Sequence, residues 1–230
     1  MTSRQPPDLT PAHPPSLIDE ALHRVRSAPT ARVPDLRAVR RAVSWDCRDL
    51  RADDVFGLAD HLLRSPDVPR WFVYELVSAH PVAMAALDVA ALERLGEGMK
   101  SWGEVDPFAC FLSGVAWREG RIADADIHRW AADADRWWRR AALVSTVPLN
   151  LRSRGGTGDV RRTLRVCDLL RADRDDMVVK AMSWAVRALV PHDPGAVRKY
   201  IQRYRGELAP RVVREVTHKL ETGLKSGARR

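Results

Sequence analysis

The sequence has few features of a metal-bound or disulfide-stabilised protein. Its 230 residues include three cysteines, Cys47, Cys110 and Cys167, which lie far apart and form no Cys-x-x-Cys pair. This spacing favours neither a structural zinc site nor a disulfide framework, and it indicates a reducing compartment.

Motifs of several enzyme classes are also missing. The seven histidines form no His-Glu-x-x-His motif, and no serine lies in a Gly-x-Ser-x-Gly setting, so neither a metal cofactor nor a hydrolase triad is expected. His61, His80 and His218 are interpreted as plain helix residues rather than ligands. The segment RSRGGTG, residues 152–158, has three glycines but not the spacing of a phosphate-binding loop. It is interpreted as a flexible connection that places two arginines near a nucleic-acid backbone.

No run of apolar residues is long enough for a spanning helix, and residues 1–15 hold five prolines, which does not fit a signal peptide. We expect a soluble, cytoplasmic monomer without membrane contact or organic cofactor. Residues 1–15 and the basic tail 223–230 are expected to be disordered, and residues 16–222 to form a single domain.

Apolar residues recur at spacings of three and four, whereas β-branched alternation is almost absent, so the sequence predicts an all-α protein. Start signals agree: Ser16 heads a Ser-x-x-Asp box, Asp53 and Asp54 precede an apolar stretch, and Asp193 and Pro210 mark two later helices. The predicted helices are 16–27, 35–44, 53–64, 69–79, 82–99, 104–118, 123–132, 136–147, 159–171, 176–190, 194–204 and 210–222.

Many short helices joined by short links fit an α-solenoid of stacked antiparallel pairs, HEAT-like or ARM-like, better than a four-helix bundle. Internal repetition is too weak to name a repeat from self-similarity. Lys and Arg number 38 against 30 Asp and Glu, a formal charge of +8, which favours a polyanionic partner such as nucleic acid or an anionic membrane surface.

Two helices combine a tryptophan with charged side chains. Trp102 and Asp106, four residues apart at the start of helix 104–118, share one side of it, with Asp106 clear of the core. On helix 176–190, Trp184 lies at the flank of the buried stripe beside Lys180 and Arg187. Indoles beside charges suit DNA, but structural roles stay open for both sets: a tryptophan packed at a helix end or interface, with solvated charges.

Helix 136–147 begins with Arg136, Trp137, Trp138, Arg139 and Arg140. Arg140 shares a stripe with apolar residues, so its part-buried guanidinium needs an anion. That anion is a DNA phosphate or an internal acid such as Asp133, and the sequence does not choose between them.

Three stretches, KSWGEVD from Lys100, WWRRAA from Trp137 and VVKAMSWAVRALVPHDPGAVRKYIQ from Val178, resemble the AlkD-like DNA alkylation repair glycosylases, which are built from HEAT-like helix pairs. The resemblance implies a basic concave groove for double-stranded DNA. It assigns the catalytic pair to Trp102 and Asp106, a second lesion-side tryptophan to Trp184, and a DNA-contacting arginine to Arg140. Arg136, Arg139, Lys180 and Arg187 are the further expected DNA contacts.

The implied reaction is release of cationic N3- or N7-alkylated purines without base flipping, as a step of base excision repair. The alkylated base is already a good leaving group, and cleavage passes through an oxocarbenium-like sugar that a carboxylate and indole faces stabilise. The alternatives are a glycosylase specialised for a bulky natural-product adduct, a non-catalytic module for distorted or branched DNA, and a protein-interaction solenoid.

Overall fold

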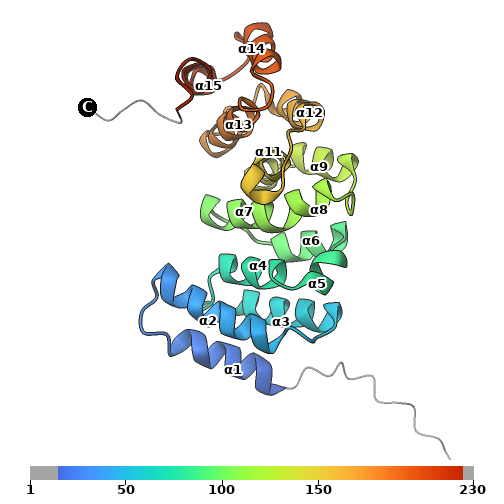
Figure 1. Ribbon diagram of the computed structural model, residues 1–230, viewed down its shortest axis with the longest axis vertical. Helices are drawn as coiled ribbons and strands as arrows, with labels where there is room; N and C mark the ends of the chain where they lie inside the picture. Colours follow the sequence, from blue (N-terminus) through green and yellow to red (C-terminus); the bar gives the residue numbers. More distant parts are fainter. Residues whose placement is uncertain (1–14, 225–230) are drawn as a thin grey trace, which may run out of the picture. The chain divides into compact units, whose positions relative to one another are not determined.

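The computed structural model describes residues 15–224, with side chains from residue 17 onward, and within this part of the chain every regular element is a helix (Figure 1). The all-α prediction is therefore confirmed. The chain divides into two compact units, one ending at Ala86 and the other beginning at Leu87. The single domain expected over residues 16–222 stays a prediction. Pro15, expected to be disordered with residues 1–14, is the first residue of α1 (Pro15–Arg26), so Ser16 lies inside the helix and not before it as predicted. The side chain of Ser16 and the disorder expected for 1–14 and 225–230 fall outside the described residues.

The described part of the first unit, residues 15–86, holds five helices, in which α3 and α4 pack on each other and on their neighbours. They are α1 (Pro15–Arg26), α2 (Val33–Asp46), α3 (Ala52–Arg64), α4 (Arg70–Ser78) and α5 (Pro81–Ala85). Asp53 and Asp54 lie in the first turn of α3 rather than before it. Carboxylates at this position stabilise the helix, because the N-terminal end of a helix is partly positive.

His80 is a helix cap and not the plain helix residue that the sequence suggested. It precedes α5, is only 4% exposed, and its Nδ1 accepts the Ala83 backbone N–H at 3.1 Å. Its Nε2 lies 3.1 Å from the Cys47 carbonyl oxygen, to which it donates. The predicted helix 82–99 is in fact α5 and a later helix. Asp88 starts the later one, because its side chain accepts the Ala91 N–H at 2.7 Å.

The second unit contains the predicted site. Its α-helices are α6 (Val89–Gly96), α7 (Trp102–Phe108), α8 (Gly114–Arg118), α9 (Asp124–Ala131), α10 (Arg136–Ser145), α11 (Val147–Asn150), α12 (Val160–Leu170), α13 (Asp176–Leu189), α14 (Pro194–Arg203) and α15 (Pro210–Thr222). A π-helical segment, residues Ala109–Ser113, joins α7 to α8, and a 3-10 turn covers Arg152–Arg154. Asp193 and Pro210 start α14 and α15 as predicted.

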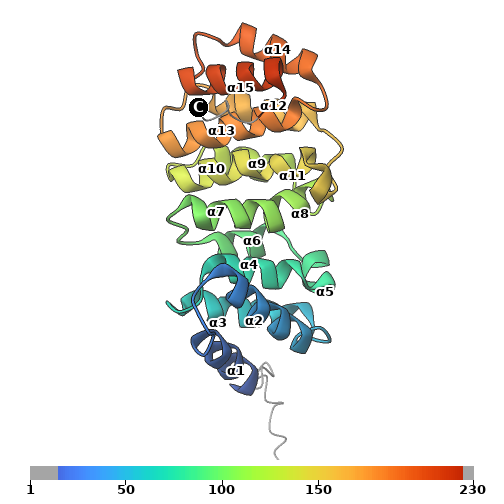
Figure 2. The same cartoon turned by 60° about the vertical axis from the view of Figure 1, so that its left-hand side comes forward.

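Helices of this unit form two layers (Figure 2). In one layer α7, α10, α13 and α15 follow one another, with α10 packed against α7 and α13, and α13 against α15. In the other layer α9 packs on α10, α12 on α13 and α14 on α15. Stacked pairs of this kind confirm the α-solenoid. Each helix buries one stripe against its partner and its stacked neighbours, and the other stripe stays accessible.

An aromatic cluster fixes α7 and α10 against α9. The Trp130 and Trp138 ring centroids are 5.0 Å apart, and Phe108 meets Trp138 edge-on at 5.9 Å. The Trp130 indole N–H donates to Glu93 at 2.8 Å, so its one polar atom is satisfied. Buried aromatic packing therefore sets the spacing of the helices that carry the predicted site.

Candidate active site

Trp102 and Asp106 lie on the first two turns of α7. The helix begins at Trp102, two residues earlier than predicted, so both side chains belong to regular helix and share a face. Trp102 is 61% exposed, whereas the Asp106 side chain is only 18% exposed. The indole is thus open to a ligand, and the carboxylate is recessed beside it.

The buried stripe of this helix forms largely as predicted. Val105, Phe108, Leu112 and Ala116 have no exposed surface, although Val115 is half-buried. Pro107 lies inside α7, and the π-helical segment follows it directly. A proline removes one backbone donor, and π-type turns are frequent at functional sites in helices.

Arg140 binds Asp106 through two parallel hydrogen bonds. Its Nε donates to one carboxylate oxygen and its Nη2 to the other, both at 2.9 Å, and Nη1 donates to the Met177 carbonyl at 2.5 Å. Arg140 is 5% exposed. One guanidinium on α10 therefore joins the Asp106 of α7 to the first turn of α13.

This pairing answers the question that the sequence left open. The anion beside Arg140 is an internal acid, but it is Asp106 and not Asp133. Asp106 is accordingly not clear of the core as its helical angle suggested, because the neighbouring helix covers it. A DNA contact for Arg140 stays a prediction, and in this structure its donors are directed at protein oxygens.

Burial raises the pKa of the Asp106 carboxyl above its ordinary value of 3.8, while the hydrogen bonds and charge of Arg140 act in the opposite direction. Each carboxylate oxygen has two lone pairs, and Arg140 uses one on each. The remaining lone pairs can accept a hydrogen bond from water or stabilise a nearby cation. Arg140 therefore fixes the position of the Asp106 carboxylate and leaves one lone pair on each of its oxygens free to accept a further contact.

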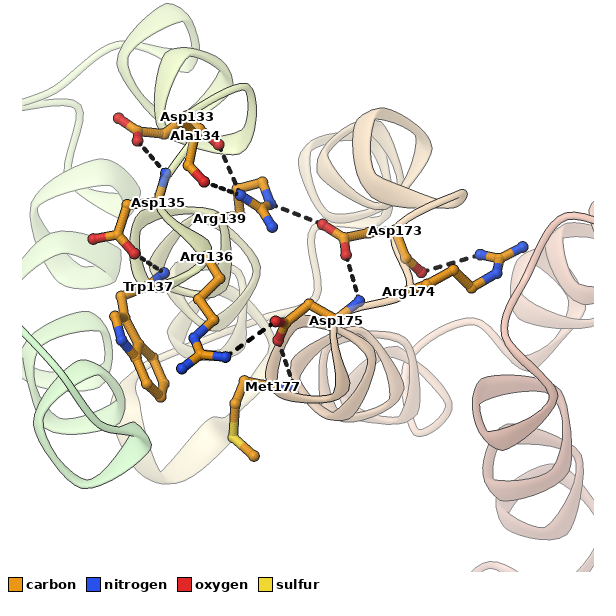
Figure 3. A network of polar contacts seen from close by, with 10 residues as sticks. All are labelled: Asp133, Ala134, Asp135, Arg136, Trp137, Arg139, Asp173, Arg174, Asp175 and Met177. Atoms are coloured by element: carbon orange, nitrogen blue, oxygen red, sulfur yellow. Dashed lines mark hydrogen bonds and ion pairs between the residues drawn. The ribbon is translucent and has the colours of Figure 1, made fainter.

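The loops before α10 and α13 have the same construction (Figure 3). Asp135 accepts the Trp137 N–H at 2.9 Å and caps α10, and Asp175 accepts the Met177 N–H at 2.8 Å and caps α13. Two residues earlier, Asp133 and Asp173 accept the N–H groups of these capping residues at 2.7 and 2.8 Å. The two Asp-x-Asp turns are 40 residues apart (173 − 133), a spacing within the range of HEAT-type repeats.

Arg139 and Arg136 connect these two turns (Figure 3). Arg139 donates to Asp173 at 2.8 Å and to the carbonyls of Asp133 and Ala134, and its side chain is 20% exposed. Arg136 is half exposed and lies 3.4 Å from Asp175. Arg139 therefore has a structural position, whereas the exposed guanidinium of Arg136 remains accessible to a ligand. Their DNA-binding roles stay predictions.

One stripe of α13 carries Lys180, which is exposed, and Trp184 and Arg187, which are half-buried. Lys180 pairs with Asp176 at 2.5 Å. Arg187 donates to the Ser183 carbonyl and hydroxyl at 3.1 Å and lies 3.7 Å from Glu215. Burial lowers the Arg187 pKa, partly offset by Glu215.

Trp184 is half-buried and lines a pocket of about 630 Å³ whose wall includes neither Trp102 nor Asp106. It lies seven residues after Met177, which is about 10 Å along the helix axis. Among the described residues, no hydrogen bond or ring contact connects Trp184 to Trp102 or Asp106. The structure therefore brings Trp102, Asp106 and Arg140 to one end of the helical layer and places Trp184 further along it.

Sequence reasoning missed Asn150 and Lys219 among the residues of the Trp184 pocket. They come from different elements, and no spacing in the sequence relates them. The described residues contain no group of three or more His, Cys, Asp or Glu that could hold a metal ion. In the same residues, no helix has the length and apolar character needed to cross a bilayer.

The site presents a recessed carboxylate, that of Asp106 held by Arg140, beside the exposed indole of Trp102. This arrangement suits a cation. No curated protein matches the chain. A family model described as DNA alkylation repair enzyme matches residues 27–220, which include every residue of this site. The chain belongs to the DNA alkylation repair enzyme family.

Proposed function

We propose that the protein is a monofunctional DNA glycosylase that hydrolyses the N-glycosidic bond of cationic N3- or N7-alkylated purines in duplex DNA. The observation that carries the proposal is the Asp106 carboxylate, fixed by Arg140 and located on the same helix face as the exposed Trp102. Membership of an alkylation repair family supplies the substrate class.

The chemistry follows from the charge of the lesion. Alkylation at N3 or N7 makes the purine cationic, so the glycosidic bond breaks without strong acid catalysis, and positive charge develops on the sugar. A fixed carboxylate stabilises that charge and orients the attacking water. The exposed face of Trp102 adds a cation–π contribution beside it. No metal or organic cofactor takes part in the proposed reaction.

Arg140 is a positioning residue in this proposal. It holds both Asp106 oxygens, so the carboxylate does not rotate away from the reacting sugar when DNA binds. Trp102 is 61% exposed, which agrees with action on a base that is not flipped into a deep cavity.

Release of alkylated purine from methylated duplex DNA tests the proposal. Asp106→Asn should lower the single-turnover rate on the order of a hundredfold or more, because it removes the charge that stabilises the transition state. DNA affinity should stay close to that of the unaltered protein. Glu104→Gln is the matched control: it removes one negative charge two residues away and keeps an oxygen to accept the Lys100 N–H.

Absence of base release from any alkylated duplex would refute the glycosylase proposal. Equal rates for Asp106→Asn and Glu104→Gln would remove Asp106 from the mechanism. Arg140→Lys separates positioning from stability, because it keeps the positive charge but cannot form the two parallel hydrogen bonds to Asp106. Its rate should fall while its DNA affinity changes little.

A further inference from the structure

The pocket beside Trp184 is rich in cationic side chains. Its wall is formed by Asn150, Leu151, Arg152, Trp184, Arg187, Ala188, Pro191, His192 and Lys219. Three of these side chains are cations, and none is a carboxylate. Trp184, Leu151 and Ala188 supply an apolar surface in the same space. The pocket therefore fits a ligand with both an anionic group and a flat apolar part.

The loop 152–158 lines this pocket through Arg152, and it is not the flexible connection that its glycines suggested. The Gly156 N–H donates to the Leu151 carbonyl at 2.9 Å, and the Gly158 N–H to the Leu149 carbonyl at 3.0 Å. Gly156 is buried so closely that an added Cβ would lie 2.5 Å from the Pro148 oxygen. Arg118 also donates to the carbonyls of Pro148 and Arg154. Gly156 thus serves close packing, whereas Gly155 and Gly158 have positive φ angles of 77° and 96°, which glycine adopts readily.

Asn150 and His192 brace the pocket. The Asn150 amide donates to the Thr146 carbonyl and the Thr163 hydroxyl, both at 2.9 Å, and its side-chain oxygen accepts the Asp159 N–H at the same distance. The His192 Nε2 donates to the Asn150 carbonyl at 2.6 Å. The pocket wall is thus joined by hydrogen bonds to α11, α12 and the end of α13.

Two cations of the pocket are available to an anion. Arg152 is exposed and has no ion pair among the described residues. Lys219 is half-buried, and its amine donates to the carbonyl of Gly223, a neutral acceptor that leaves the positive charge uncompensated. Arg187 is more constrained by Ser183 and Glu215. Arg152 and Lys219 therefore make this end of the layer electropositive.

We propose that the pocket binds one nucleotide unit of the DNA strand next to the reaction site, with its phosphate against Arg152 and Lys219 and its sugar or base against Trp184. The proposal rests on the proposed function for the identity of the polymer. Arginine and lysine are the usual phosphate partners in DNA complexes, and indole faces stack on sugars and bases. The pocket volume of about 630 Å³ leaves room for more than a phosphate.

The experiment measures binding of the full chain to an unmodified duplex at several salt concentrations. Arg152→Ala combined with Lys219→Ala should weaken binding roughly tenfold, the size of one charge-assisted hydrogen bond. The slope of log K against log salt should fall by about 0.9, the value for one phosphate contact. The control is Arg165→Ala combined with Arg198→Ala, an equal loss of charge at exposed positions on α12 and α14.

A pocket variant that binds like the unaltered protein, or a control pair that loses as much affinity and slope as the pocket pair, overturns the proposal. Circular dichroism of both variants checks that they are folded. This result is independent of the glycosylase test. Base release that depends on Asp106, together with an unchanged salt slope in the pocket variant, would keep the proposed function and reject the pocket. Absence of all DNA binding would reject both.

Discussion

Replacement of Arg140 by methionine should cost the second unit about 3 kcal/mol. The change removes two hydrogen bonds to Asp106 and one to the Met177 carbonyl. It leaves a carboxylate that is 18% exposed without its cation. Loss of one partner from a buried ion pair typically costs about 3–5 kcal/mol. The lower end applies because Asp106 keeps some solvent contact and its raised pKa lets it take up a proton.

A double-mutant cycle isolates the pair from other effects of the substitution. Asp106→Asn removes the charge and keeps the shape of the side chain. The variant with both substitutions should therefore lose less stability than the sum of the two single variants, and the difference, the coupling energy, should be about 1.5–3 kcal/mol. Native-state hydrogen exchange of the α10 amides measures the free energy of unfolding of the second unit by itself. This choice of assay matters because a chain with two compact units need not unfold in one step.

The control cycle uses Arg161 and Asp124, an ion pair at 3.2 Å whose side chains are 76% and 37% exposed. Exposed pairs of this kind couple by about 0.2–1 kcal/mol. If the Arg140–Asp106 coupling is no larger than that of the control, then the guanidinium does not hold the carboxylate, and its positioning role in catalysis fails with it.

Three further results are expected. Because burial raises the Asp106 pKa, the folded state binds this proton more tightly than the unfolded state. Its contribution to stability therefore falls as pH rises through the window above 3.8, and single-turnover base release, which needs the carboxylate, should fall as pH drops through the same window; an acid limb at or below 3.8 would contradict this. Gly156→Ala should cost about 1–3 kcal/mol in urea unfolding, because its Cβ would overlap backbone atoms, whereas Gly206→Ala, with open space around the position, should be neutral; equal effects would refute the packed loop. Burial raises the pKa of Cys47 to about 11 and that of Cys110 to about 12, so both thiols should react with iodoacetamide at neutral pH only in denaturant; rapid labelling of the native protein would show that they are accessible.

The helical class, most of the helix positions and several caps followed from the sequence because they depend on local patterns, although predicted helices 82–99 and 104–118 are interrupted. Apolar spacing of three and four gives the buried stripes, and Asp193 and Pro210 start their helices as their types predict. Errors occurred where local rules compete with packing. His80 looks like a helix residue but caps α5 by accepting the Ala83 N–H, and its other ring nitrogen donates to the carbonyl of Cys47, 33 positions away. The glycines of 152–158 suggested flexibility, yet Gly156 is required by close packing.

The predicted site shows the same division. Sequence spacing alone placed Trp102 and Asp106 on one helix face, and the stripe on helix 136–147 showed that Arg140 needs an anion. Only the tertiary structure decided that the anion is Asp106, 34 residues earlier on a stacked helix, and that Trp184 lines a separate pocket with Arg152 and Lys219. The physical reason is that helix periodicity sets the direction of a side chain around its own axis. The residue that it meets depends on how neighbouring helices stack, and that is fixed by buried contacts far apart in the sequence.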